Sequence, residues 1–209
     1  MNGVNEGIFA HWPNRITALR FLGALSLFAI FAVYGDSDMA GVKSRRGVFQ
    51  VAFWLFIATS LSDILDGWLA RRGNNVTAFG RIADPFVDKV LVMGAMVFLA
   101  VMPWSRPWFP AWIVVVILSR EFLITAIRGY VESVGAAFPA DWFGKVKMFL
   151  QCWAVGIVVG LAAFEFPPDV RQMWGVIGHL CVLATLLASV GSGVTYVLKT
   201  RRMLARSPR

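Results

Sequence analysis

Four aspartates lie within 26 residues, between two long apolar stretches of the chain. Asp63 and Asp66 are three residues apart at the end of the first stretch, and Asp84 and Asp88 are four apart at the start of the second. If both stretches are helical, each pair lies on one helix face, and the two faces can meet across a short polar loop. Four carboxylates in an apolar setting repel one another and lose hydration, so they stay ionised only beside cations. We therefore predict that they bind divalent metal ions.

Small and basic residues lie between the two aspartate pairs. The missing side chain of Gly67 and the small one of Ala70 would let a substrate approach the helix closely. Arg71 follows at the helix end, where its planar guanidinium can bind a diphosphate through two hydrogen bonds. An alternative interpretation makes all of these residues ordinary polar groups facing lipid headgroups, but it gives no reason for aspartates paired at helical spacing.

A second group of charges lies inside a later apolar stretch. Arg120 and Glu121 are adjacent there, and Arg128 follows two turns later. Charges in an apolar helix are costly, so we expect them to face the interior of a helix bundle. We interpret Glu121 as the group that fixes an arginine and Arg128 as a phosphate ligand. A purely structural Arg–Glu pair is the alternative.

Two lysines begin the next apolar stretch. Gly144, Lys145 and Lys147 combine an accessible backbone, the N-terminal end of a helix and two ammonium groups, which suits a small phosphate. The alternative is that these lysines only set the orientation of the chain in a membrane.

The start of the first apolar stretch also carries polar residues at helical spacing. Asn14, Thr17 and Arg20 lie three residues apart, with Asn14 as a candidate helix cap. A charge at Arg20 requires either an anion or a path to the membrane surface. We expect this face to lie near the nucleotide or phosphate end of a site.

The composition indicates an all-α integral membrane protein. The chain has 209 residues, 58% of them hydrophobic, and its mean hydropathy is +0.67. We predict one domain over residues 1–209, formed by a short interfacial segment at 1–13 and a bundle of six transmembrane helices. The six predicted spans are residues 16–34, 47–70, 77–102, 111–131, 144–166 and 173–198.

The positive charge of the chain points to membranes rather than to nucleic acid. The formal charge is +8, and the basic residues gather at the ends of the apolar stretches, where anionic headgroups and phosphates lie. With the N-terminus inside, thirteen of the basic residues near the spans fall inside and five outside. We therefore expect the termini and the site to face the cytoplasm. Cys152 and Cys181 are predicted to be small core residues, and His179 to form an interhelical hydrogen bond.

The full spacing of the central stretch carries a resemblance to a known family. The pattern Asp63-x2-Asp66-Gly67-x2-Ala70-Arg71-x8-Gly80-x3-Asp84-x3-Asp88 resembles the motif of the CDP-alcohol phosphatidyltransferases, with every fixed position filled. The resemblance implies a CDP-linked lipid donor, a homodimer and two Mg²⁺ or Mn²⁺ ions on the four aspartates. It assigns the role of base to Asp88, although the residues alone do not separate base from metal ligand. The residues then expected to bind CDP are Asn14, Thr17, Gly67, Ala70, Arg71 and Gly80.

Two later runs narrow the resemblance. SREFLITAIRGYVESVG and GKVKMFLQ are similar to runs of the bacterial phosphatidylglycerophosphate synthases, except that Met148 replaces a usual Thr and Glu132 a frequent Ala. This implies CDP-diacylglycerol as donor, sn-glycerol 3-phosphate as acceptor, and phosphatidylglycerophosphate and CMP as products, made at the inner membrane. The acceptor phosphate would then meet Arg120, Arg128, Lys145 and Lys147.

Three alternatives to this reaction remain at the level of sequence. The acceptor can be another alcohol of the same family, such as inositol phosphate, serine or phosphatidylglycerol. A membrane phosphatase with two metal ions would use water instead of an acceptor. A cation transporter would place its acids near the middle of broken helices, whereas these acids lie at the ends of two helices beside a basic loop.

Overall fold

The computed structural model describes residues 12–73, 78–133 and 142–206, with side chains at 14–62, 83, 86–133 and 146–201. The regular elements within these residues are α-helices, which confirms the predicted all-α class. They are α1 (Trp12–Tyr34), α2 (Met39–Ser44), α3 (Arg46–Gly73), α4 (Ala78–Val101), α5 (Ala111–Ser133), α6 (Trp142–Ala163) and α7 (Pro168–Arg206).

A long helix occupies each of the six stretches expected to span a membrane. Among the described residues, three helical segments are long and apolar enough to cross a bilayer: 14–34, 146–163 and 168–201. These support a membrane protein, while six spans remain a prediction. The expected interfacial segment at 1–13 lies almost wholly outside the described residues.

Helix ends differ from expectation at three places. The first helix begins at Trp12, so Asn14 lies inside it and the predicted cap is wrong. The loop expected before the second span contains the six-residue helix α2, capped by Asp38, whose Oδ1 accepts a hydrogen bond of 2.8 Å from the Gly41 amide. The last helix is longer than expected because Pro168 and Asp169 form a favourable first turn.

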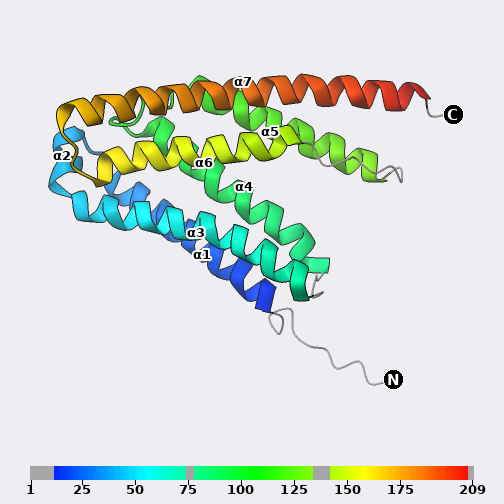
Figure 1. The fold of residues 1–209 in the computed structure, drawn as a ribbon, viewed down its shortest axis with the longest axis horizontal. Coiled ribbons are helices and arrows are strands. Elements are labelled where there is room, and N and C mark those ends of the chain that lie inside the picture. The colour runs from blue at the N-terminus through cyan, green and yellow to red at the C-terminus, as the bar shows by residue number, and fades with distance from the viewer. Residues whose placement is uncertain (1–11, 74–77, 134–141, 207–209) are drawn as a thin grey trace.

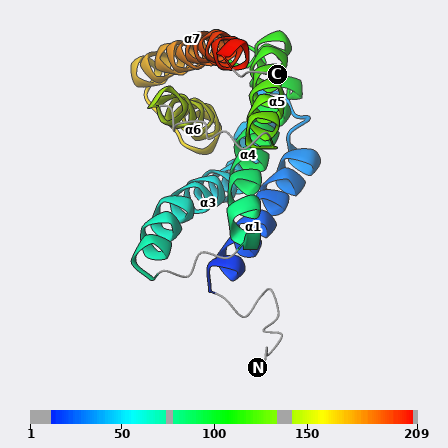
Figure 2. The same cartoon turned by 90° about the vertical axis from the view of Figure 1, so that its right-hand side faces the viewer.

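The helices pack as two groups, one of α1, α3 and α4 and the other of α5 and α7, and α6 joins the two groups. Helix α1 packs on α3 and α4, and α6 lies between α3 and α7, while α5 packs on α7. Figure 1 shows that α3 runs antiparallel to α1 and to α6, that α7 runs antiparallel to α6, and that the two groups diverge toward the right-hand end. In Figure 2, seen from that end, α6 and α7 lie apart from α1 and α3.

Apolar side chains fill the interior and also cover the outside. Phe31, Phe49 and Phe56 are fully buried, whereas Leu19, Phe122 and Leu187 are more than 60% exposed. An outward apolar surface on long helices is what a lipid environment requires. His179 is hydrogen-bonded, but its Nε2 lies 3.1 Å from the carbonyl oxygen of Pro107, which is in the turn between α4 and α5, so the expected partner on another helix is wrong.

Candidate active site

Close contacts between helices show which residues lie level with one another. A methyl group added at Gly23 of α1 would lie 2.8 Å from Thr59 Oγ1 of α3, so the two antiparallel backbones approach closely there. Counted from this contact, residues 14–20 of α1 lie beside residues 62–68 of α3. The polar face of the first helix therefore adjoins the helical turns that carry the first aspartate pair.

The same turns of α3 lie level with the start of α6. A methyl group added at Gly160 would lie 3.3 Å from Phe53 Cε2, and the two helices are antiparallel. Extending that register places residues 147–151 of α6 level with residues 62–66 of α3. The two helices diverge from the contact at Gly160 toward this level, so a space separates their backbones there.

Asp88 is the aspartate of the predicted metal set whose side chain the structure describes. It forms an ion pair with Arg20 across the α1–α4 interface. Only 4% of Arg20 is exposed, and a charge so deeply buried needs an opposite charge to compensate for lost hydration. The expectation that Arg20 meets an anion is confirmed, and Asn14 and Thr17 are buried on the same helix.

Three predicted residues form a buried group of charges between α5 and α6. Glu121 Oε1 pairs with both the Arg120 guanidinium and the Lys147 ammonium. The side chains of all three are less than a tenth exposed. Arg120 also donates a 2.7 Å hydrogen bond to Ser192 Oγ of α7, so the group joins side chains of α5, α6 and α7. Glu121 therefore fixes an arginine, as its sequence context indicates.

Two further cations extend this group toward the surface. Lys89 Nζ donates to Thr125 Oγ1 at 2.7 Å, and Arg128, which is exposed, donates to the Tyr196 hydroxyl at 3.0 Å. Lys89 lies within electrostatic range of Arg120 and Arg128, and Lys147 within range of Arg120 and Lys89. We call Lys89, Arg120, Arg128 and Lys147 the cation cluster.

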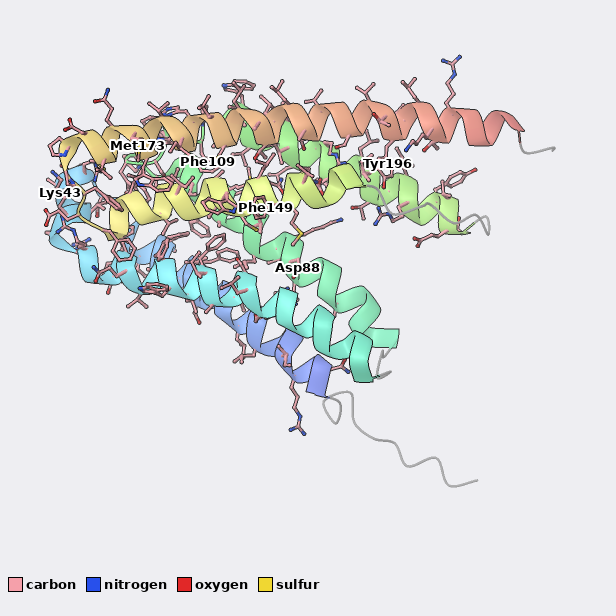
Figure 3. All side chains as sticks on the ribbon, in the orientation of Figure 1. Lys43, Asp88, Phe109, Phe149, Met173 and Tyr196 are labelled. Atoms are coloured by element: carbon pink, nitrogen blue, oxygen red, sulfur yellow. The ribbon has the colours of Figure 1, made fainter. Side chains whose placement is uncertain are left out.

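The cation cluster and Asp88 occupy the same part of the molecule. Lys89 follows Asp88 directly in α4, so the two side chains leave adjacent positions of one helix. Figure 3 shows Asp88 near the middle of the view and Tyr196 to its right, both away from Lys43 and Met173 at the left. Within the described part of the chain, the cation cluster gathers four positive side chains near Glu121, and such groups suit the binding of a phosphate anion.

Other predicted site residues have side chains outside the described part of the chain. Their backbone positions are in the last turns of α3, the first turns of α4 and the first turn of α6. Among the side chains that are described, no group of three or more metal-ligating residues occurs. The predictions that remain untested in this way concern Asp63, Asp66, Gly67, Ala70, Arg71, Gly80, Asp84 and Lys145.

Sequence reasoning missed the contribution of the last helix. Ser192 and Tyr196 of α7 hold Arg120 and Arg128 through hydrogen bonds to the two guanidinium groups. A detectable signal was present, because the buried polar residues of α7 recur at intervals of three or four: Thr185, Ser189, Ser192, Tyr196 and Thr200. Single hydroxyl groups in an apolar helix are inexpensive, so they attract less attention than charges.

Comparison with known proteins identifies relatives of this chain by sequence. Residues 10–190 match the sequence profile of the family described as CDP-alcohol phosphatidyltransferase. The CDP-diacylglycerol–glycerol-3-phosphate 3-phosphatidyltransferase of Bacillus subtilis (strain 168) is 40% identical over 151 residues, which cover 70% of this chain and 75% of that protein. A probable phosphatidylglycerophosphate synthase of Mycobacterium tuberculosis (strain H37Rv) is 31% identical over 193 residues, 92% of this chain and 83% of that protein.

Proposed function

The chain belongs to the CDP-alcohol phosphatidyltransferase family, and on that premise we propose that it transfers a phosphatidyl group from CDP-diacylglycerol to sn-glycerol 3-phosphate. The products are phosphatidylglycerophosphate and CMP. The names of the relatives in Bacillus subtilis and Mycobacterium tuberculosis support this donor and acceptor. We further propose that the site faces the cytoplasm at the inner membrane and that the enzyme works as a homodimer.

The cation cluster is the observation that supports sn-glycerol 3-phosphate as the acceptor. A phosphate dianion needs several cations, and Arg120 and Lys147 provide two that are already desolvated and held by Glu121. Arg128 adds a third at the exposed edge, where an acceptor from the cytoplasm would arrive. A neutral alcohol would leave these charges without compensation, so a phosphorylated acceptor fits better.

The carboxylates fit divalent metal ions by their chemistry. Oxygen donors suit hard cations, and Asp88 holds its carboxylate near the turns of α3 that carry Asp63 and Asp66. We propose that Asp63, Asp66, Asp84 and Asp88 hold two Mg²⁺ or Mn²⁺ ions. When bound, such ions supply charge neutralisation for the diphosphate.

Residues of the chain carry out the remaining tasks. The cation cluster together with Lys145 orients the acceptor, so that its free hydroxyl points toward the aspartates. The hydroxyl oxygen bonds to the phosphorus that carries the diacylglycerol, the bond from that phosphorus to CMP breaks, and Asp88 takes the hydroxyl proton. We place the nucleotide along Asn14, Thr17, Gly67, Ala70, Arg71 and Gly80.

The test is CMP release from CDP-diacylglycerol by purified protein with a panel of acceptors. We expect release with sn-glycerol 3-phosphate, loss of release with EDTA, and recovery with added Mg²⁺. Release without any acceptor would indicate a phosphatase. Release with inositol phosphate, serine or phosphatidylglycerol, but not with sn-glycerol 3-phosphate, would keep the family reaction and reject this acceptor.

A further inference from the structure

Several buried polar atoms of α6 and α7 near the cation cluster have no hydrogen-bond partner, among them Gln151 Nε2, Thr185 Oγ1 and Ser189 Oγ. Gln151 of α6 is 4% exposed and its Nε2 has none, and Thr185 of α7 is 1% exposed and its Oγ1 has none. A buried donor without an acceptor is destabilising, because its hydrogen bonds to water are lost and not replaced. Such groups are therefore expected to meet a polar ligand or an ordered water molecule.

The two groups lie at the same level between α6 and α7. A methyl group added at Gly178 would lie 3.4 Å from Ile157 Cγ2, which fixes the register of these antiparallel helices. Gln151 is six residues before Ile157 on α6, and residue 184 is six residues after Gly178 on α7. Gln151 therefore lies level with residue 184, beside Thr185. Helices α6 and α7 pack against each other, and both side chains are buried at this level.

This level also lies between the two parts of the proposed site, which are the cation cluster and the aspartates. Gln151 lies one helical turn beyond Lys147, whose ammonium pairs with Glu121. Along the bundle, the register of α3 with α6 places Gln151 level with residue 62, next to Asp63. A molecule that reaches from the cation cluster to the aspartates would therefore lie at the level of Gln151.

We propose that Gln151, with Thr185 beside it, binds the hydroxyl group of the acceptor that does not react. The inference rests on the proposed function, because it takes the acceptor to be a glycerol phosphate. Such an acceptor carries two hydroxyls, one that attacks the donor and one that remains and must be hydrogen-bonded in a desolvated site. The Gln151 amide donates to the oxygen of that second hydroxyl. Gln151 and Thr185 are thus specificity-determining residues, which select a polyol phosphate over a simple alkanol phosphate.

The experiment compares sn-glycerol 3-phosphate with 3-hydroxypropyl phosphate. The second compound keeps the phosphate and the primary hydroxyl and lacks only the secondary hydroxyl. We expect the wild-type enzyme to prefer sn-glycerol 3-phosphate by about tenfold or more in kcat/KM, the range expected when a buried polar group loses its partner. Gln151→Leu should remove most of this preference by lowering kcat/KM for sn-glycerol 3-phosphate, with the value for 3-hydroxypropyl phosphate changed by less than about twofold.

The preference is a ratio measured on one preparation, so it does not depend on how much enzyme is folded. Thr185→Val should reduce the ratio in the same direction and provides a second variant if Gln151→Leu does not insert. Ser105→Ala is the matched control, because Ser105 is also a buried hydroxyl, bonded to the Leu99 carbonyl at 2.7 Å, at the far end of α4 from Asp88. That variant should leave the ratio unchanged.

Two results would overturn the role of Gln151, and a third would reject the proposed function. An equal loss with both acceptors in Gln151→Leu would assign the side chain to packing or to a structural water and overturn the proposal. A wild-type enzyme that uses both acceptors equally would overturn it as well. If wild-type enzyme releases CMP with neither phosphorylated acceptor, the proposed function fails instead.

Discussion

Glu121 lies between two buried cations and determines the charge balance of the candidate site. Its Oε1 pairs with Arg120 on its own helix and with Lys147 on the next. Removing one partner of a buried ion pair is far more costly than removing an exposed pair, because the remaining charge stays desolvated. Loss of the Glu121 carboxylate would therefore leave two buried cations without this partner.

Glu121→Gln should destabilise the substrate-free protein by roughly 3 kcal/mol, the scale found when a buried pair loses one member. Added sn-glycerol 3-phosphate should raise the melting temperature of this variant more than that of wild type, because the phosphate supplies the missing negative charge. Thermal unfolding in detergent with and without the acceptor measures both effects. An equal ligand-induced shift in the two proteins would remove the phosphate from this group.

Glu165→Gln is the matched control for the loss of a carboxylate. Glu165 is exposed and accepts a 3.0 Å hydrogen bond from Arg46, which lowers the pKa of the Glu165 carboxyl. Any stabilisation from this pair is present at neutral pH and is lost as the pH falls through the lowered pKa. Solvent screens an exposed pair, so the variant should unfold at nearly the wild-type temperature at pH 7.

Variants of Arg128 and Tyr196 separate two contributions to acceptor binding. One is the charge of Arg128, and the other is the hydrogen bond to Tyr196 that holds the Arg128 guanidinium in place. Arg128→Ala should raise KM for sn-glycerol 3-phosphate by about 10- to 100-fold with a smaller effect on kcat, since it removes a charge-assisted contact. Tyr196→Phe keeps the arginine and removes only the 3.0 Å hydrogen bond that holds it, so KM should rise by less than about tenfold. Steady-state kinetics at saturating CDP-diacylglycerol test both. An unchanged KM in Arg128→Ala would take Arg128 out of the acceptor site.

At the scale of helices, α7 supports the site through one polar face. Ser192 and Tyr196 lie on this face and bond to arginines of α5, and Gly193 leaves room for the alkyl chain of Arg120. A methyl group at Gly193 would lie 3.1 Å from Arg120 Cγ, closer than side chains normally pack. The helix thus positions the arginines by both hydrogen bonds and available space.

Gly193→Ala should therefore raise KM for sn-glycerol 3-phosphate, by several-fold, through displacement of Arg120. The control is Gly191→Ala, two residues earlier on the same helix, where an added methyl group meets nothing within 4 Å. Both variants gain the same helix propensity, about 1 kcal/mol, so a difference between them reports on packing alone. Equal kinetics in the two variants would contradict a positioning role for α7.

The six long helices and the charged site residues were predictable from the sequence for related physical reasons. Long apolar stretches have few structural solutions in a membrane protein, and charges such as Arg20 and Glu121 are too costly there to lack partners. The partners themselves were not predictable, because nothing in the sequence states that Arg20 meets Asp88 or that Lys147 meets Glu121. Those pairs depend on helix register, which small contacts such as Gly23 with Thr59 determine.

The short helix α2 and the end of the long helix α7 were harder to predict. The six residues of α2 carry too little periodicity to distinguish a helix from a loop, although Asp38 gives a capping signal. The end of α7 was placed too early because Lys199 and Arg201 mark the end of an apolar stretch, whereas the backbone hydrogen bonds continue to Arg206. Hydropathy locates the edge of a membrane, and it does not locate the end of a helix.

At the scale of the whole molecule, the two ends of the bundle differ, and the site lies away from the end with α2. Lys43 lies at that end, Asp88 lies near the middle of the view, and Tyr196 lies farther toward the end where α7 terminates (Figure 3). Helix α7 has 39 residues and is about 58 Å long at the usual rise, well beyond a hydrocarbon core of about 30 Å. Its basic end should therefore project past the membrane on the same side as the site.

Cysteine labelling in intact cells tests this orientation. Lys43→Cys and Lys199→Cys are placed on exposed positions at opposite ends, in a background where Cys152 and Cys181 are replaced by serine. We expect a membrane-impermeant maleimide to label Lys43→Cys from outside, and Lys199→Cys only after the membrane is opened, because basic segments are retained in the cytoplasm. The three basic residues around the loop at Lys43 oppose this orientation, which makes that position the more informative one. Labelling of Lys199→Cys in intact cells would place the cation cluster on the outer side, where a phosphorylated acceptor from the cytoplasm cannot reach it.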